Sequence, residues 1–169
     1  MNILFVCTGN ICLSPAAETV LKFIIKNNEL SDSIHVSSRG LIDYHVGEKA
    51  DGRMKKYALK RGYEIKTTAK QFDPTTDFEH FDYIVAMDDD NLAEMDKLDP
   101  KKQYADKIHT MTAFSQKPTH YDHIPDPYYS PGNKGFVLVM DLLEDACQGL
   151  FLELQKKADD KSWKPKRSF

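Results

Sequence analysis

A short stretch near the N-terminus collects residue types that suit phosphate chemistry. It reads Cys7-Thr8-Gly9-Asn10-Ile11-Cys12-Leu13-Ser14 and is followed by Pro15. Gly9 lets the backbone approach a ligand closely, and Asn10 tolerates a left-handed conformation or braces the loop through its side chain. Convergent backbone N–H groups, together with the N-terminus of a following helix, can bind a phosphate group. We call residues 7–14 the phosphate loop.

Cys7 stands at the mouth of this predicted cradle. A thiol among backbone donors at a helix N-terminus is expected to have a lowered pKa and to exist largely as thiolate. Ser14 is placed to donate a hydrogen bond to the same sulfur. A thiolate beneath a phosphoryl group is positioned for in-line attack. The alternative is a small buried cysteine that ends a core strand, but the surrounding residues favour the phosphate loop.

The sequence on either side of the phosphate loop predicts a strand before it and a helix after it. Residues 2–7 are almost wholly apolar, which is typical of a strand buried in a parallel sheet. Ser14 and Pro15 suit the N-cap and first turn of a helix. Apolar residues then recur at helical spacing up to Asn27 and Asn28.

Strands and helices alternate along the rest of the chain. Apolar runs predict a short strand, Ile34-His35-Val36, within residues 33–38, and further strands over residues 81–87 and 107–114. A glycine at position 62, the carboxylates at 88–90 and a late apolar face predict helices over residues 51–60, from 88 onward and over 135–157. This order predicts one α/β domain over residues 1–158, a three-layer fold with a central parallel sheet of about four strands and helices on both faces. Residues 159–169 are expected to form a polar, basic tail. Ligands bind such sheets at the carboxyl ends of the strands, where the phosphate loop lies.

Composition narrows the class of protein. The chain has 169 residues, of which 41% are hydrophobic, and a net charge of −3, which does not point to nucleic acid as the main partner. No apolar run approaches the ~18 residues of a membrane span, and the N-terminus has no signal-peptide pattern. Three cysteines without such a pattern favour free thiols and a cytoplasmic location. His120 and His123 are the only close histidine pair, and they lack a third ligand at metal-site spacing.

The phosphate loop resembles the signature loop of the low-molecular-weight protein-tyrosine phosphatases, in which a nucleophilic cysteine is followed by five residues, an arginine, and a serine or threonine. The segment Ile124-Pro125-Asp126-Pro127-Tyr128-Tyr129 is similar to the late loop of that family. Residues 36–38 resemble its second strand, and residues 81–92 its third strand and following helix. The matches are spread from residue 2 to about 150 in the order of the family.

The resemblance implies a role for each matching residue. Cys7 is the expected nucleophile, and Asp126 protonates the leaving phenol and later activates water. The residues expected to bind phosphate or order the loop are Thr8, Gly9, Asn10, Ile11, Cys12, Ser14 and Ser38. Tyr44, Tyr128 and Tyr129 are expected to wall the cleft against an aromatic substrate.

The same resemblance implies the ligands and a redox response. The expected substrates are phosphotyrosine proteins or small aryl phosphates, and inorganic phosphate is the product. No metal ion or other cofactor is implied. Cys12 corresponds to a second loop cysteine that can form a disulfide with Cys7 and protect it from further oxidation.

Leu13 departs from the family at its arginine position. A guanidinium there grips two phosphoryl oxygens and stabilises their charge in the transition state, whereas leucine has no donor. The missing group predicts turnover depressed by at least about 10³. Arg39, directly after Ser38, is a candidate substitute, although a solvated arginine is the plainer interpretation. Thr67 is a second departure, because the family often has a loop-bracing histidine there.

Three functions are compatible with parts of this pattern. One is a tyrosine phosphatase of low or rescued activity, and another is a pseudophosphatase that binds anions or phosphotyrosine as a regulatory module. The third, a thioredoxin-coupled arsenate reductase, needs further cysteines in the middle of the chain. None lies between Cys12 and Cys147, so the sequence argues against a reductase.

Overall fold

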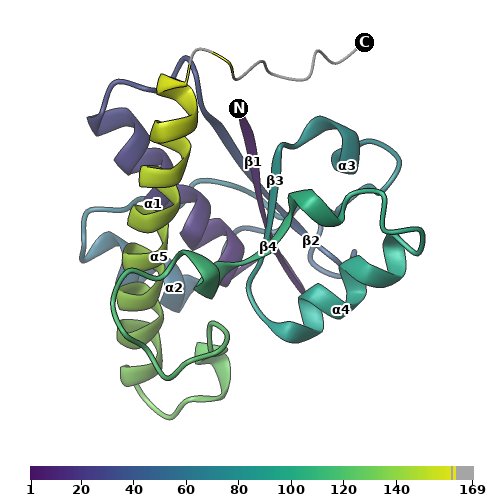
Figure 1. Cartoon of the computed structure of the whole chain (residues 1–169). Coiled ribbons are helices and arrows are strands. Elements are labelled where there is room, and N and C mark those ends of the chain that lie inside the picture. Colours follow the sequence, from purple (N-terminus) through teal and green to yellow (C-terminus); the bar gives the residue numbers. More distant parts are fainter. Residues whose placement is uncertain (161, 163–169) are drawn as a thin grey trace.

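Four parallel strands form the centre of the fold in the computed structural model, which describes residues 1–160 and 162 (Figure 1). The strands are β1 (Asn2–Cys7), β2 (His35–Gly40), β3 (Tyr83–Ala86) and β4 (Ile108–Thr110), in the order β2-β1-β3-β4. The chain therefore leaves β1 toward one edge of the sheet and later returns to its other side. Such a switch point opens a crevice at the carboxyl ends of the strands. The phosphate loop begins there.

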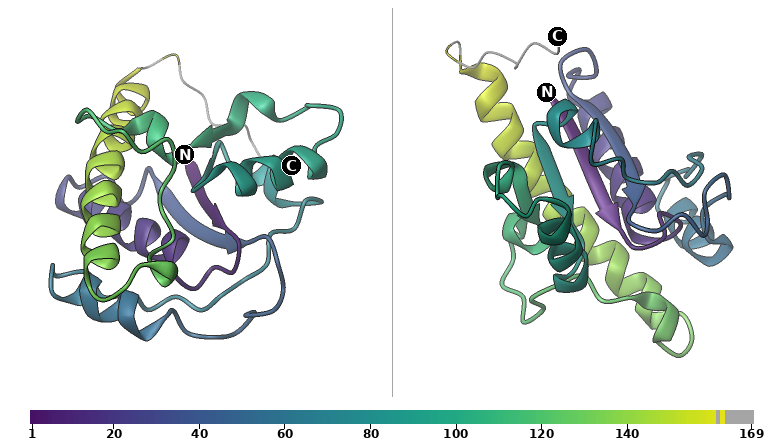
Figure 2. Two further views of the ribbon diagram at one scale, coloured as in Figure 1. Left: turned by 90° about the horizontal axis from the view of Figure 1, so that it is seen from below. Right: turned by 90° about the vertical axis from the view of Figure 1, so that its right-hand side faces the viewer.

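Helices cover both faces of the sheet, as Figures 1 and 2 show. The helices on one face are α1 (Leu13–Asn27), α2 (Gly52–Leu59) and α5 (Lys134–Asp159), and those on the other are α3 (Asp77–His80) and α4 (Asp89–Leu98). The short 3₁₀ helices are η1 (Ala105–Lys107), η2 (Met111–Phe114) and η3 (Pro127–Tyr129). The predicted three-layer α/β fold is confirmed. Among the described residues, no helix combines the length and apolar character needed to cross a membrane.

The two faces of the sheet bury separate apolar clusters because side chains alternate along each strand. Ile3 and Phe5 belong to the larger cluster with α1, α2 and α5. Leu4 and Val6 belong to the smaller cluster, together with Phe78 of α3. A buried strand with both faces covered explains the unbroken apolar run from residue 3.

Some predicted boundaries are wrong. The second strand starts at His35, after the predicted start, and continues to Gly40, because it pairs with the full length of β1. The predicted fourth strand is shorter and ends in the 3₁₀ turn η2. Helix α1 begins at Leu13, and its N-cap residue is Cys12 rather than Ser14. Most of the predicted tail lies outside the described residues, and α5 ends at Asp159.

Candidate active site

Cys7 ends β1 and lies beneath the N-terminus of α1. Its Sγ atom is 2.9 Å from Ser14 Oγ, and the backbone N–H of Asn10 donates to it at 3.3 Å. Ser14 therefore contacts the sulfur, as the sequence predicts. This contact also explains why Ser14 does not cap the helix, since its hydroxyl is directed to the loop instead.

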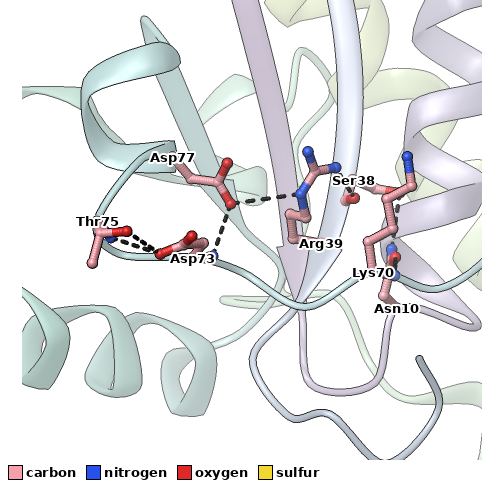
Figure 3. Close-up of polar contacts among 7 residues, drawn as sticks. All are labelled: Asn10, Ser38, Arg39, Lys70, Asp73, Thr75 and Asp77. Carbon is pink, nitrogen blue, oxygen red and sulfur yellow. Dashed lines mark hydrogen bonds and ion pairs between the residues drawn. The ribbon is translucent and has the colours of Figure 1, made fainter.

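Asn10 is the central brace of the phosphate loop. It adopts a left-handed conformation with φ of 57° and is almost fully buried. Its Nδ2 donates to Ser14 Oγ and to Ser38 Oγ, both at 2.8 Å, and its Oδ1 accepts from the backbone N–H of Lys70 at 2.9 Å. Figure 3 shows Asn10 beside Lys70, on the same side of the view as Ser38. A single side chain thus joins the loop, β2 and the segment before β3.

Glu18 extends this network, although the sequence analysis missed it. Ser38 Oγ donates to Glu18 Oε2 at 2.5 Å, and Lys22 Nζ lies 2.5 Å from Glu18 Oε1. Glu18 is only 3% exposed, so its carboxylate is held by these two donors. Its spacing was a usable signal, because Glu18 follows Ser14 by four residues and lies on the same face of α1.

Thr67 lies where the family often has a bracing histidine, and it makes no such contact here. Its Oγ1 is buried and has no hydrogen-bond partner among the described residues. The predicted departure therefore leaves one polar atom unsatisfied, while the Asn10, Ser38 and Glu18 contacts still hold the loop.

Backbone contacts anchor the phosphate loop from several sides. The N–H of Leu41 donates to Cys7 O at 3.0 Å, and that of Asp51 donates to Ile11 O at 2.7 Å. Asn91 Nδ2 donates to Thr8 Oγ1 at 3.1 Å. Gly40, which the sequence analysis missed, lies so close that an added Cβ would be 2.9 Å from the carbonyl carbon of Gly9. A side chain at position 40 would therefore displace the loop.

Burial dominates the electrostatics of the loop thiols. It raises the pKa of Cys7, while hydrogen bonds from Ser14, Asn10 and Gly9 oppose this shift. The predicted lowering of the Cys7 pKa is therefore wrong for this chain: the site is buried and Leu13 supplies no positive charge. The pKa of Cys12 is also raised, mainly by burial and to a smaller extent by the negative charges of Cys7, Asp51 and Asp126. All three cysteines are free thiols.

Leu13, the first residue of α1, belongs to the apolar core. It is 6% exposed and packs in the cluster between the sheet and α1, α2 and α5. Its side chain supplies no hydrogen-bond donor to the loop. Position 13, where the resemblance to the family implies an arginine, is thus occupied by a core residue.

Arg39 does not replace the missing arginine. Its Nε lies 3.5 Å from Asp77 Oδ2, its Nη1 donates to Ser38 O at 2.9 Å, and its guanidinium lies over Phe81. Figure 3 shows the side chain directed toward Asp77, away from Asn10. Because neighbouring residues of β2 point to opposite faces of the sheet, Ser38 reaches the loop and Arg39 does not.

Three further predicted residues, Asp126, Tyr128 and Tyr44, are exposed, and Arg53, which the sequence analysis missed, lies beside Tyr128; we call these four residues the exposed rim. Asp126 accepts a hydrogen bond from the Tyr128 N–H at 2.8 Å, and its charge reaches Cys12. The Arg53 guanidinium lies 4.8 Å from the centre of the Tyr128 ring. Tyr44 is 79% exposed and meets His45 edge-on. The side chain of Tyr129 lies outside the described part of the structure.

Comparisons with known proteins agree with this geometry. The family model described as low molecular weight phosphotyrosine protein phosphatase matches residues 2–160. A Synechocystis protein, provisionally named as a low molecular weight protein-tyrosine-phosphatase, is 44% identical and aligns over 93% of this chain and 98% of its own.

Solved structures extend the likeness to the fold. A protein tyrosine phosphatase from Entamoeba histolytica, with Hepes in its active site, superposes with a TM-score of 0.87 at 44% identity and covers 94% of this chain and 99% of its own. A Drosophila protein described as an arginine phosphatase gives a TM-score of 0.83 at 28% identity, over 92% of this chain and 98% of its own.

Proposed function

Because this chain belongs to the low molecular weight phosphotyrosine protein phosphatases, a family of hydrolases that release phosphate from phosphotyrosine, we propose that Cys7 is its nucleophile. The Cys7 thiolate attacks phosphorus in line, a sulfur–phosphorus bond forms, and the bond to the phenolic oxygen breaks. Asp126 gives its proton to the departing phenolate. The Asp126 carboxylate then takes a proton from water, which attacks the phosphocysteine, releases inorganic phosphate and restores the thiolate.

The observation that carries this proposal is the contact chain from Cys7 through Ser14 and Asn10 to Ser38. It holds the sulfur at the floor of a loop that opens at a helix N-terminus, where a tetrahedral dianion is favoured. The Entamoeba structure holds Hepes, which carries a sulfonate, in its active site. An anion of similar geometry is thus compatible with the fold of this loop.

Leu13 sets the level of activity that we propose. The sulfur, the loop and Asp126 remain, but residue 13 supplies no guanidinium to stabilise the phosphoryl oxygens in the transition state. Arg39 is directed away from the loop, where it pairs with Asp77, and Arg53 lies in the rim, over Tyr128 and 3.6 Å from Asp51. We therefore expect a phosphatase of depressed turnover. The alternative is a pseudophosphatase that binds phosphotyrosine or other anions without useful turnover.

The first test compares aryl phosphate hydrolysis by this chain and by its Leu13→Arg variant. Restored contacts to the transition state should raise turnover by about 10³ or more. Equal activity of the two proteins would mean that another group already replaces the arginine. If both proteins are inactive while free phosphate still protects Cys7 from iodoacetate, the binding role becomes the better proposal.

The chemical class of the phosphorylated side chain needs a separate comparison, because one structural relative is described as an arginine phosphatase. The exposed rings of Tyr44 and Tyr128 favour an aromatic leaving group. We expect the Leu13→Arg variant to hydrolyse a phosphotyrosine peptide faster than a phosphoarginine peptide of the same sequence. The reverse order would contradict the proposed substrate class.

A further inference from the structure

A groove of about 820 Å³ runs between α2 and residues 64–68 and has a strongly basic border. Resting on the proposed function, the geometry points to a docking site for an acidic segment of the phosphotyrosine protein that this chain recognises. The residues that define the groove are Lys49, Lys55, Lys56, Lys60, Leu59 and Ile65.

The charge of the groove opposes that of the whole chain. Five lysines line it, and the single acidic lining residue, Glu64, lies 3.1 Å from Lys66 in an ion pair. Lys49, Lys55 and Lys56 have no ion-pair partner within the described residues. The full chain carries a net charge of −3, so this local excess of positive charge is not a general property of the surface. It is complementary to a run of carboxylates.

The floor of the groove is apolar. Leu59 is 62% exposed, and Ile65 lies beneath the groove at 4% exposure. Lysine stems add further apolar surface between the charged heads. An aliphatic side chain within an acidic peptide fits this arrangement. None of the lining residues is aromatic, so stacking with nucleic-acid bases is not available, and a peptide is favoured over an oligonucleotide.

Residues next to each wall of the groove contact the phosphate loop. Asp51, immediately before α2, donates its N–H to Ile11 O at 2.7 Å. Lys70, two residues after the lining residue Thr68, donates its N–H to Asn10 Oδ1 at 2.9 Å (Figure 3). Lys49 and Thr68 join the walls in an antiparallel bridge. Each residue of an extended peptide spans about 3.3 Å, so a segment a few residues from a phosphotyrosine at Cys7 can enter the groove.

The test measures binding of peptides that carry a phosphonate analogue of phosphotyrosine, which cannot be hydrolysed. One peptide has glutamates and a leucine beside the analogue, and its partner has glutamines in place of the glutamates. This chain should bind the acidic peptide about tenfold more tightly. The variant Lys56→Glu with Lys60→Glu should lose this preference. A charge-matched variant, Lys101→Glu with Lys156→Glu, should keep it, because both exposed lysines lie away from the groove.

Three results would overturn the inference. The preference could survive in the groove variant, it could fall equally in the charge-matched variant, or an oligonucleotide of equal charge could bind as tightly with the same dependence on Lys56 and Lys60. If both peptides bind equally and phosphate still protects Cys7, the docking role of the groove is wrong but the proposed function stands. Binding of neither peptide, without phosphate protection, would remove both.

Discussion

The phosphate loop and the exposed rim differ in how they are held. Asn10, Ser14 and Ser38 in and beside the loop are almost fully buried, and each contacts at least one other member of the network. The rim residues Tyr44 and Tyr128 are exposed, and their described contacts are mainly with neighbouring rings and one guanidinium. Rigidity is therefore concentrated where an anion would bind, and freedom is left where the substrate's side chain would enter.

From this difference we expect anion binding and the stabilisation of transition-state charge to be separable in this fold. The loop keeps its shape through Asn10 and the backbone, and none of these contacts involves the side chain of residue 13. Exchanging that residue removes a catalytic group without dismantling the cradle. If the loop and the rim contribute to different quantities, substitutions in the two regions should change stability and rate separately.

The largest expected effect is a loss of turnover on substitution of Asp126, the acid of the exposed rim. In the Leu13→Arg background, Asp126→Asn removes the proton donor but keeps an acceptor for the Tyr128 N–H. General acid catalysis is worth about 10²–10⁴ in rate, so turnover of an aryl phosphate with a poor leaving group should fall by that factor. Steady-state kinetics would show it, with unchanged melting temperature. An unaltered rate would mean that another group protonates the phenol.

The loop brace should matter most for stability. Asn10→Ala removes the donors to Ser14 and Ser38 and the acceptor for Lys70, and should lower the free energy of unfolding by about 2–4 kcal/mol. Asn91→Ala is the matched control. Asn91 is equally buried but donates only to Thr8, with its Oδ1 unsatisfied in the described structure. Urea denaturation should show a clearly smaller loss for Asn91→Ala; equal losses would contradict the bracing role.

The reactivity of Cys7 should report the missing positive charge. Because burial raises its pKa, the thiol stays protonated through its ordinary range near ~8.5, and alkylation by iodoacetamide should rise only at higher pH. A guanidinium nearby favours the thiolate, so Leu13→Arg should lower the Cys7 pKa. Cys147, whose pKa burial also raises, is an internal control that should stay unreactive in both proteins. If the pH profiles of Cys7 alkylation are the same in the two proteins, an arginine at position 13 does not reach the Cys7 thiol.

The smallest effect should come from the rim contact between Arg53 and Tyr128. Arg53→Met keeps most of the aliphatic stem but removes the cation above the ring, which is worth about 0.5–1 kcal/mol at an exposed position. KM for an aryl phosphate should change by a few fold, with little change in melting temperature. A loss of stability as large as that of Asn10→Ala would show that the rim, too, is structural.

The sequence predicted the fold well because its signals were local and strong. The apolar run of β1, the acidic start of α4 and the long apolar face of α5 each correspond to an observed element. The limits of β2 were predicted less well, since Ser37, Ser38 and Arg39 are not typical strand residues. Pairing with β1, rather than intrinsic preference, extends this strand to Gly40.

Site residues could be predicted where a sequence motif specifies them. The prediction failed where contacts between distant segments determine a residue's surroundings. Cys7 contacts Ser14 as expected, and Asn10 joins Ser14 to Ser38. Glu18 was missed because a helical carboxylate is ordinarily solvated, and only the fold shows that Ser38 buries it. The Cys7 pKa was predicted with the wrong sign because the sequence shows the hydrogen-bond donors but not the depth of burial.

The burial of Leu13 has a thermodynamic consequence. Fully burying a leucine side chain contributes about 1.5–3 kcal/mol, whereas an arginine directed at the loop would contribute little of this to the core. The Leu13→Arg protein should therefore melt at a lower temperature while it hydrolyses phosphate esters faster. We therefore expect residue 13 to exchange stability for activity, with leucine favouring the stability of the fold and arginine favouring the rate of the reaction.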